Sequence, residues 1–409
     1  MALSERTRKI LAVLLFSVSI FGIGGALYFT FFRAPTPPAA PAVVSSVAPS
    51  GALPSSVPGA PTAAPSPGAG APLPTPSPVA AGGPTATTLL TQAPVADTTL
   101  NGNGASMNYY DRTDGHFYTI DANGNVQSLS DKSFPQVSSV AWNKTGSKAV
   151  LTFPDDSKIV YDFANQKQVT LPSQWQDVSF SPIGDQLEAK DMALDPQNRW
   201  LVTSNADGSN VRAIQDLGDN ADSVTVSWSP NDQVVAFAKS PSLPQDSLYR
   251  QSLVPIGKNN ENFQALTVEG LGFQPQWSPG GSQLLYSVSG DFSNGKPLLW
   301  ITDATPNTMD QNRRSLGLNT WADKCTFASS ATLYCAVPTS LPDQAGLQRV
   351  LFRTNPDQLY KVDVATGQTS LVAAPQGGVA MENLQVSKDG GTLFFTDAST
   401  QQLERIRLK

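Results

Sequence analysis

The feature that most constrains the fold is a strand-pair motif that recurs six times after residue 130. In each copy a β-rich run ends at an aromatic or aliphatic residue, which we call the closing residue. A turn of Ser, Pro, Gly, Asn or Asp follows, and after it comes a second β-rich run. The closing residues lie 38 to 59 positions apart and are Trp142, Phe180, Trp228, Trp277, Phe327 and Val386. A period of about 45 residues with several strands in each repeat is typical of a β-propeller. We therefore predict an all-β propeller with one blade per repeat.

The number of blades follows from the segments on either side of the six copies. Residues 107–130 contain three further β-rich runs, so seven blades is the favoured count, with six and eight as alternatives. The last repeat ends after three runs, whereas a blade usually has four strands. We expect residues near 88–100 to supply the missing strand, because this would close the ring and remove a free sheet edge.

The copies resemble the repeats of TolB-like propellers, which are relatives of WD40 propellers. The resemblance covers residues 136–409 and is clearest at Trp228-Ser229-Pro230, Trp277-Ser278-Pro279, Ser387-Lys388-Asp389-Gly390 and Ala206-Asp207-Gly208-Ser209. It implies the fold. It does not imply a Tol-Pal role, because the periplasmic TolB proteins have a separate α/β domain and a cleaved signal where this chain has other segments.

The amino-terminal region predicts a membrane anchor. Residues 10–32 contain no charged side chain, and 23 helical residues are long enough to cross a bilayer core of about 30 Å. Arg6, Arg8 and Lys9 precede this span, and Arg33 is the only basic residue that follows closely. The positive-inside rule then places the amino terminus in the cytoplasm. We expect a single-pass protein of the inner or plasma membrane with an extracytoplasmic propeller; a cleaved signal peptide is the alternative.

A proline-rich spacer is predicted between the anchor and the propeller. Residues 34–88 contain 15 prolines among Ala, Ser, Gly and Thr, and no charged residue. Such a composition buries too little apolar surface to offset the entropy of ordering, so we expect a disordered linker. The predicted organisation is a cytoplasmic stub (1–9), a transmembrane helix (10–32), a linker (33–100) and the propeller (101–409).

Composition excludes several function classes. The net charge is −6, so the basic surface of a nucleic-acid-binding protein is lacking. His116 is the only histidine and there are two cysteines, so multi-histidine and four-thiolate metal sites are excluded. No GxSxG motif is present. We expect no catalytic residues, no metal, no cofactor and no enzymatic activity.

The two cysteines flank one predicted turn. Cys325 and Cys335 lie on either side of Ser330, at positions that can face each other across a hairpin. In an exported domain such a pair is expected to be oxidised, so we predict a disulfide. Two buried free thiols are the alternative.

A partner surface is predicted from loop lengths. The connections between the second and third strands of a blade emerge on one face, and those of blades three to six are long whereas those of blades two and seven are short. The long loops carry the aromatic and charged residues that are enriched at binding sites. The candidate partner-binding residues are Tyr249, Arg250, Asp291, Phe292, Lys296, Arg349, Phe352 and Arg353.

These observations predict a membrane-anchored protein-binding or scaffolding module of the cell envelope. Its partner would be an envelope protein or a cell-wall component bound on one propeller face. Two alternatives stay open: an envelope hydrolase that uses carboxylates, and a structural tether with no specific ligand.

Overall fold

The computed structural model describes residues 75–240 and 250–409. The predicted transmembrane helix over 10–32 and most of the predicted linker lie outside these residues. Within the described ranges, no helix combines the length and the apolar character needed to cross a bilayer.

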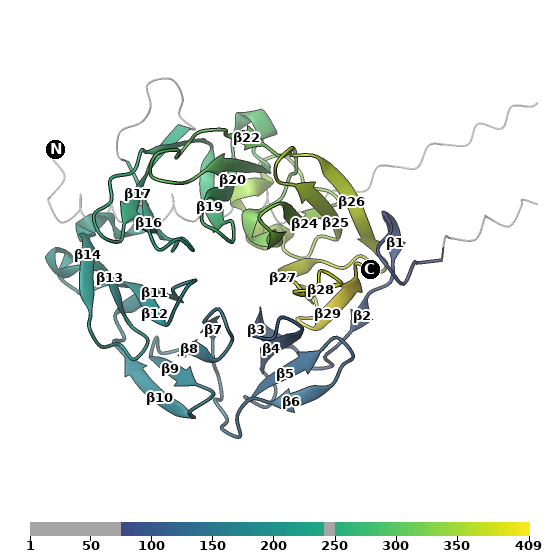
Figure 1. Cartoon of the computed structure of the whole chain (residues 1–409), viewed down its shortest axis with the longest axis horizontal. Helices are drawn as coiled ribbons and strands as arrows, with labels where there is room; N and C mark the ends of the chain where they lie inside the picture. Colours follow the sequence, from purple (N-terminus) through teal and green to yellow (C-terminus); the bar gives the residue numbers. More distant parts are fainter. Residues whose placement is uncertain (1–74, 241–249) are drawn as a thin grey trace, which may run out of the picture. The chain divides into compact units, whose positions relative to one another are not determined.

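Seven β-sheets surround a common centre, which confirms the seven-bladed propeller (Figure 1). The first strand of each blade lies nearest the centre, and from β3 onward neighbouring strands within a blade are antiparallel. Blades 1 to 3 consist of β3 (Val95–Leu100), β4 (Ser106–Asp111), β5 (Phe117–Asp121) and β6 (Val126–Ser128); β7 (Ser139–Trp142), β8 (Lys148–Thr152), β9 (Lys158–Asp162) and β10 (Lys167–Leu171); and β11 (Trp175–Phe180), β12 (Gln186–Asp191), β13 (Trp200–Asn205) and β14 (Arg212–Asp216).

The later blades follow the same plan. Blades 4 to 7 consist of β15 (Val224–Val226), β16 (Val234–Lys239), β17 (Arg250–Gly257) and β18 (Leu266–Glu269); β19 (Leu271–Trp277), β20 (Gln283–Ser289), β21 (Pro297–Asp303) and β22 (Arg314–Ser315); β23 (Cys325–Ser329), β24 (Thr332–Pro338), β25 (Asp357–Asp363) and β26 (Thr369–Pro375); and β27 (Met381–Val386), β28 (Thr392–Asp397) and β29 (Leu403–Arg407).

The recurring Trp-Ser-Pro motif builds the turn after the first strand of a blade. The serine hydroxyl accepts a hydrogen bond from a backbone N–H five residues later, as Ser229 does from Val234 at 2.9 Å and Ser278 does from Gln283 at 3.1 Å. This bond fixes the turn locally, because the side chain replaces a missing backbone partner. The repeat visible in the sequence is therefore the turn that joins the two inner strands.

Apolar side chains between neighbouring sheets form the core. Phe237 of blade 4 stacks on Trp277 of blade 5 with ring centroids 5.7 Å apart. The indole N–H of Trp277 donates to the Ser227 hydroxyl at 3.0 Å, so its polar end is also paired across the blades. Each blade thus completes the core of the next.

The ring is closed by the segment that precedes blade 1. β2 (Thr88–Leu89) pairs antiparallel with β29 and completes blade 7, as predicted. β1 (Gly83–Thr85) adds a fifth, parallel strand to β26 of blade 6. Residues 83–100, which composition placed in the linker, therefore contribute β1, β2 and β3. The correction has a physical reason: β1 and β2 find their backbone partners at the far end of the chain and β3 pairs with β4, and composition reveals neither pairing.

The predicted disulfide is confirmed. Cys325 and Cys335 are bonded to each other and are directly opposite in the register of β23 and β24. Both residues are buried, within the apolar core shared by blades 5 and 6.

Candidate functional site

Short 3-10 helices occupy the connections of blades 3, 5 and 6 on the face chosen by loop length. The connection of blade 4 runs through 241–249, outside the described residues. The 3-10 helices are η1 (Pro196–Asn198) in blade 3, η2 (Gly218–Ser223) before blade 4, η3 (Asp291–Ser293) in blade 5, η4 (Ala322–Lys324) before blade 6, and η5 (Ala345–Leu347) and η6 (Arg349–Phe352) in blade 6.

The blade 6 connection is packed directly against blade 5. The Gly346 N–H donates to the Gly295 carbonyl at 2.9 Å, and the Trp321 indole donates to the Gly346 carbonyl at 2.9 Å. A Cβ atom on Gly346 would lie 1.8 Å from the Ser289 hydroxyl oxygen, so only glycine allows this approach. The packing fixes the position from which η6 extends toward blade 7.

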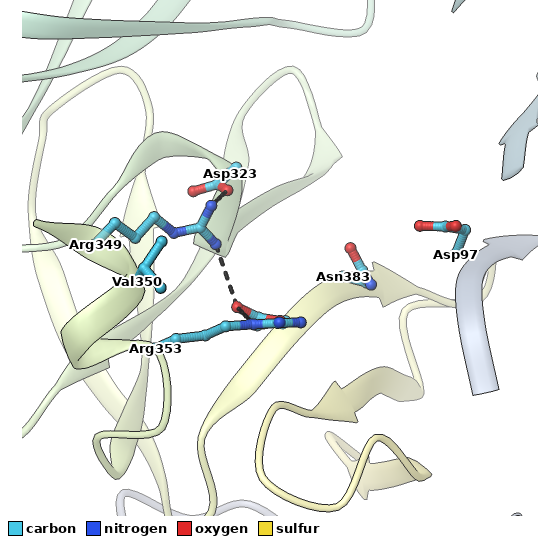
Figure 2. A pocket seen from close by; sticks show the side chains of 7 residues that line it. Asp97, Asp323, Arg349, Val350, Arg353 and Asn383 are labelled. Carbon is cyan, nitrogen blue, oxygen red and sulfur yellow. Dashed lines mark hydrogen bonds and ion pairs between the residues drawn. The ribbon is translucent and has the colours of Figure 1, made fainter. Parts of the chain in front are cut away.

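A cavity of about 360 Å³ lies where blades 6, 7 and 1 meet (Figure 2). Three carboxyl side chains, two guanidinium groups, an amide and one apolar side chain form its wall. They are Asp97 of β3, Asp323 of η4, Arg349 and Val350 of η6, the following Arg353, and Glu382 and Asn383 of β27. The cavity thus depends on segments almost 300 residues apart in the sequence.

Glu382 organises the charged side of this cavity. Its side chain is 8% exposed, and Arg353 donates three hydrogen bonds to it at 2.7 to 2.9 Å. Arg349 lies 3.4 Å from Glu382 and also forms an ion pair with Asp323. The bonds to Glu382 raise the pKa of Arg353, whereas burial raises the pKa of Asp323. Both arginines therefore have fixed positions.

Asp97 lies in a β-bulge on the opposite side. Its φ is 44°, a left-handed conformation that turns the side chain out of the regular ladder. Oδ2 accepts a hydrogen bond from the Val140 N–H at 2.7 Å, which joins blade 1 to blade 2. Burial raises the pKa of Asp97 above its ordinary value, although this hydrogen bond opposes the change. Oδ1 has no hydrogen-bond or ion-pair partner among the described residues.

Asn383 occupies the corresponding bulge of blade 7, with φ of 51°. Its side-chain amide makes no hydrogen bond to any described residue, and Figure 2 shows it on the side of the cavity nearer Asp97. Two polar groups therefore face the cavity with unused hydrogen-bonding capacity, beside a paired Arg-Glu network.

The connection that brings Val350 to the cavity exposes two further apolar side chains, and we call the three the apolar rim. Val350 is 85% exposed, Leu351 is 69% exposed and Leu347 is 59% exposed. Apolar side chains of this size in a row next to a polar cavity are a feature of protein-binding surfaces.

The side chains of this cavity can recognise a ligand by charge and hydrogen bonds. Three carboxyl groups and two guanidinium groups give the cavity a formal charge of −1. In the part of the chain that the structure describes, no group of three His, Cys, Asp or Glu side chains is arranged to hold a metal ion.

Two of the residues chosen from the sequence, Arg349 and Arg353, line the cavity. Phe352 belongs to the same short helix η6 and is half-buried, but it is not one of the lining residues. The side chain of Arg353 is 47% exposed, so it is accessible despite its bonds to Glu382.

The other candidates lie farther along the same face. Lys296 is 3.4 Å from Asp343 and links the blade 5 and blade 6 connections. Asp291 and Phe292 form η3, where Phe292 is 46% exposed and packs edge-on against Trp300.

Blade 4 supplies two further candidates. Arg250 begins β17 and lies 3.7 Å from Glu269, away from the cavity. Tyr249 lies outside the described residues.

Five residues of the cavity were missed by sequence reasoning: Asp97, Asp323, Val350, Glu382 and Asn383. Asp97 precedes Leu100, the last residue of β3, by three positions, as Asn383 precedes Val386 and Asp177 precedes Phe180. All three residues have positive φ. The signal that could have found this position is an Asp or Asn three residues before the end of the first strand of a blade. An alignment of the repeats that includes the whole first strand shows it.

The fold defines the chain as a seven-bladed β-propeller. No family model matches its sequence, and no curated protein matches it.

Solved structures match over 79% of the chain. They include the Cps50 (Swd1) β-propeller domain of Myceliophteria thermophila (10% identity, all of that chain, TM-score 0.51) and an oligogalacturonate lyase in complex with manganese (13% identity, 93% of that chain, TM-score 0.54). The oligogalacturonate lyase of Vibrio parahaemolyticus also matches, with 10% identity, 93% of that chain and a TM-score of 0.52. At these identities the likeness shows the fold alone.

Proposed function

We propose that the protein is a single-pass, membrane-anchored, extracytoplasmic propeller that binds another protein of the cell envelope, as a binding or scaffolding module with a TolB-like repeat. The observation that carries the proposal is the cavity between blades 6, 7 and 1 together with the exposed apolar side chains of η6. A polar cavity beside an apolar rim offers a partner both specificity and buried area.

Affinity capture of the full-length chain from its native membranes tests this function. The double variant Val350→Asp and Leu351→Asp changes only exposed side chains of η6 and should lose the captured protein. A control with Val126→Asp and Val169→Asp alters exposed positions on the outermost strands β6 and β10 and should retain it. Capture of the same proteins by both variants would contradict the proposal.

The membrane anchor is supported by the uncharged segment over 10–32 and the basic residues before it. A reporter enzyme that is active only outside the cytoplasm, fused at the carboxyl terminus, should be active. Activity of a reporter that works only inside the cytoplasm would contradict this topology.

A carboxylate-dependent hydrolase is the second candidate, favoured by the three carboxyl side chains in one cavity. Two of them, Asp323 and Glu382, are paired with arginines, which leaves Asp97 as the candidate proton donor. Release of reducing ends from purified cell-wall polysaccharide, lost in Asp97→Asn, would establish this function instead. The third reading, a tether with no ligand, has less support because a concave polar site exists.

A further inference from the structure

We infer that the cavity receives a basic side chain from the protein partner, with Asp97 as its main acceptor. This inference rests on the proposed protein-binding function and names the chemistry of the partner: a segment in which arginine or lysine is flanked by apolar residues.

The first argument is the charge left in the cavity. Glu382 is satisfied by Arg353 and Arg349, and Asp323 is paired with Arg349. Asp97 alone among the three carboxyl groups has no cation at ion-pair distance among the described residues, since Arg112 and Arg353 attract it only from farther away, and its Oδ1 has no partner there. A carboxylate in a partly buried site gains most from a cation that approaches from outside.

The second argument is the arrangement of the free groups. The bulges of β3 and β27 direct Asp97 and Asn383 to the same cavity, and Figure 2 shows no side chain drawn between them. The side-chain oxygen of Asn383, Oδ1, is an acceptor for a second N–H of the same cation. A guanidinium or ammonium group has several donors and no acceptor, which fits two separated oxygens.

The third argument is the apolar rim. Arginine and lysine have long aliphatic stems that pack on apolar surface while the charged end reaches a polar group. Val350 lines the cavity and is 85% exposed, so it can contact such a stem. Leu351 and Leu347 are exposed apolar side chains of the same connection, and in this proposal they contact the apolar neighbours of the basic residue.

A comparison within the ring indicates what is special about Asp97. Asp177 occupies the corresponding bulge of blade 3, but Lys190 lies 2.8 Å from its carboxylate. Blade 3 thus supplies an ion-pair partner for its own carboxylate, whereas Arg112 of blade 1 and Arg353 attract Asp97 only from beyond ion-pair distance. Asp177→Asn is therefore the matched control for Asp97→Asn.

The test uses the full-length chain in its native membranes, with a photoreactive p-benzoylphenylalanine in place of Val350. Mass spectrometry of the adduct identifies the partner segment. Asp97→Asn keeps an acceptor for the Val140 N–H and a residue type that tolerates positive φ, so the fold should persist, which thermal melting checks. We expect Asp97→Asn to reduce the adduct about tenfold and Asp177→Asn to leave it unchanged.

Glutamine in place of the partner's basic residue should cause the same loss, and combining this change with Asp97→Asn should cause no further loss. An adduct that is insensitive to Asp97→Asn, or a cross-linked segment without arginine or lysine, would overturn the inference while leaving the binding function intact. Absence of any adduct from η6 would instead refute the binding function itself.

Discussion

Lys324 and Asp357 form an ion pair inside blade 6, with the Lys324 Nζ 2.8 and 2.7 Å from the two carboxylate oxygens. Their side chains are 2% and 0% exposed. Asp357 also accepts a hydrogen bond from the Met381 N–H at 2.6 Å, so the pair fastens blade 6 to the first strand of blade 7. This strand carries Glu382, and the ion pair therefore supports one wall of the cavity.

Breaking this pair on one side should be costly. Lys324→Met leaves the Asp357 carboxylate buried without its cation, so the free energy of unfolding at pH 7.5 should fall by about 3 to 5 kcal/mol. Adding Asp357→Asn removes that charge and keeps an acceptor for the Met381 N–H, and should restore most of the loss. Urea denaturation of the single and double variants measures both values; a double variant less stable than the single one would contradict this explanation.

The same carboxyl group predicts a pH dependence. Burial raises the pKa of Asp357 from 3.8 to about 6 in the folded protein, against the attraction of Lys324. The folded state therefore binds this proton more tightly than the unfolded state does. Protonated Asp357 makes its full contribution to the free energy of unfolding below pH 3.8, and this contribution is lost as the pH rises through 6. The melting temperature of the wild type minus that of Asp357→Asn should fall between pH 4 and pH 6. A difference that rises over this interval would show that Lys324 lowers the pKa.

The disulfide should stabilise blade 6. It joins residues ten positions apart, and a loop of this length predicts a contribution of about 2 to 3 kcal/mol. Cys325→Ala with Cys335→Ala should reduce the free energy of unfolding by this amount and make it insensitive to reductant. Two alkylatable thiols in the native, unreduced protein would contradict the bond.

The closing segment should be needed for stability although it is short. The Ala80 N–H donates to the Arg407 carbonyl at 2.8 Å, and the Gly82 N–H donates to the Val372 carbonyl at 2.9 Å. Removing residues 1–90 deletes these bonds and exposes the edge of β29, so the melting temperature should fall by several degrees. Removing residues 1–74 should leave it unchanged, and equal melting of the two truncations would refute the role of the segment.

Features that depend on local sequence were predictable. The turns at Trp228 and Trp277 repeat because one serine hydroxyl fixes each turn, and Cys325 and Cys335 pair because they share a hairpin. Blade number follows from counting such units.

The cavity was not predictable in the same way. Asp97 and Glu382 are far apart in the sequence and meet only because β2 closes the ring. Loop length did indicate Arg349 and Arg353, since long connections carry side chains across to neighbouring blades. Loop length gave no sign of Glu382, because this residue lies inside a strand. Its place at the site becomes evident only from its ion pairs with Arg349 and Arg353.

The central claim is that the partner binds where blades 6, 7 and 1 meet. A position scan of the photoreactive residue in native membranes tests it most directly, with Val350 at the cavity, Leu194 on the distant blade 3 connection and Val169 on the outer strand of blade 2. Val350 and Leu194 are 85% and 99% exposed, so accessibility alone favours Leu194. We predict that the adduct yield is highest at Val350 and near background at Val169. A yield at Leu194 or Val169 equal to or above that at Val350 would contradict the account.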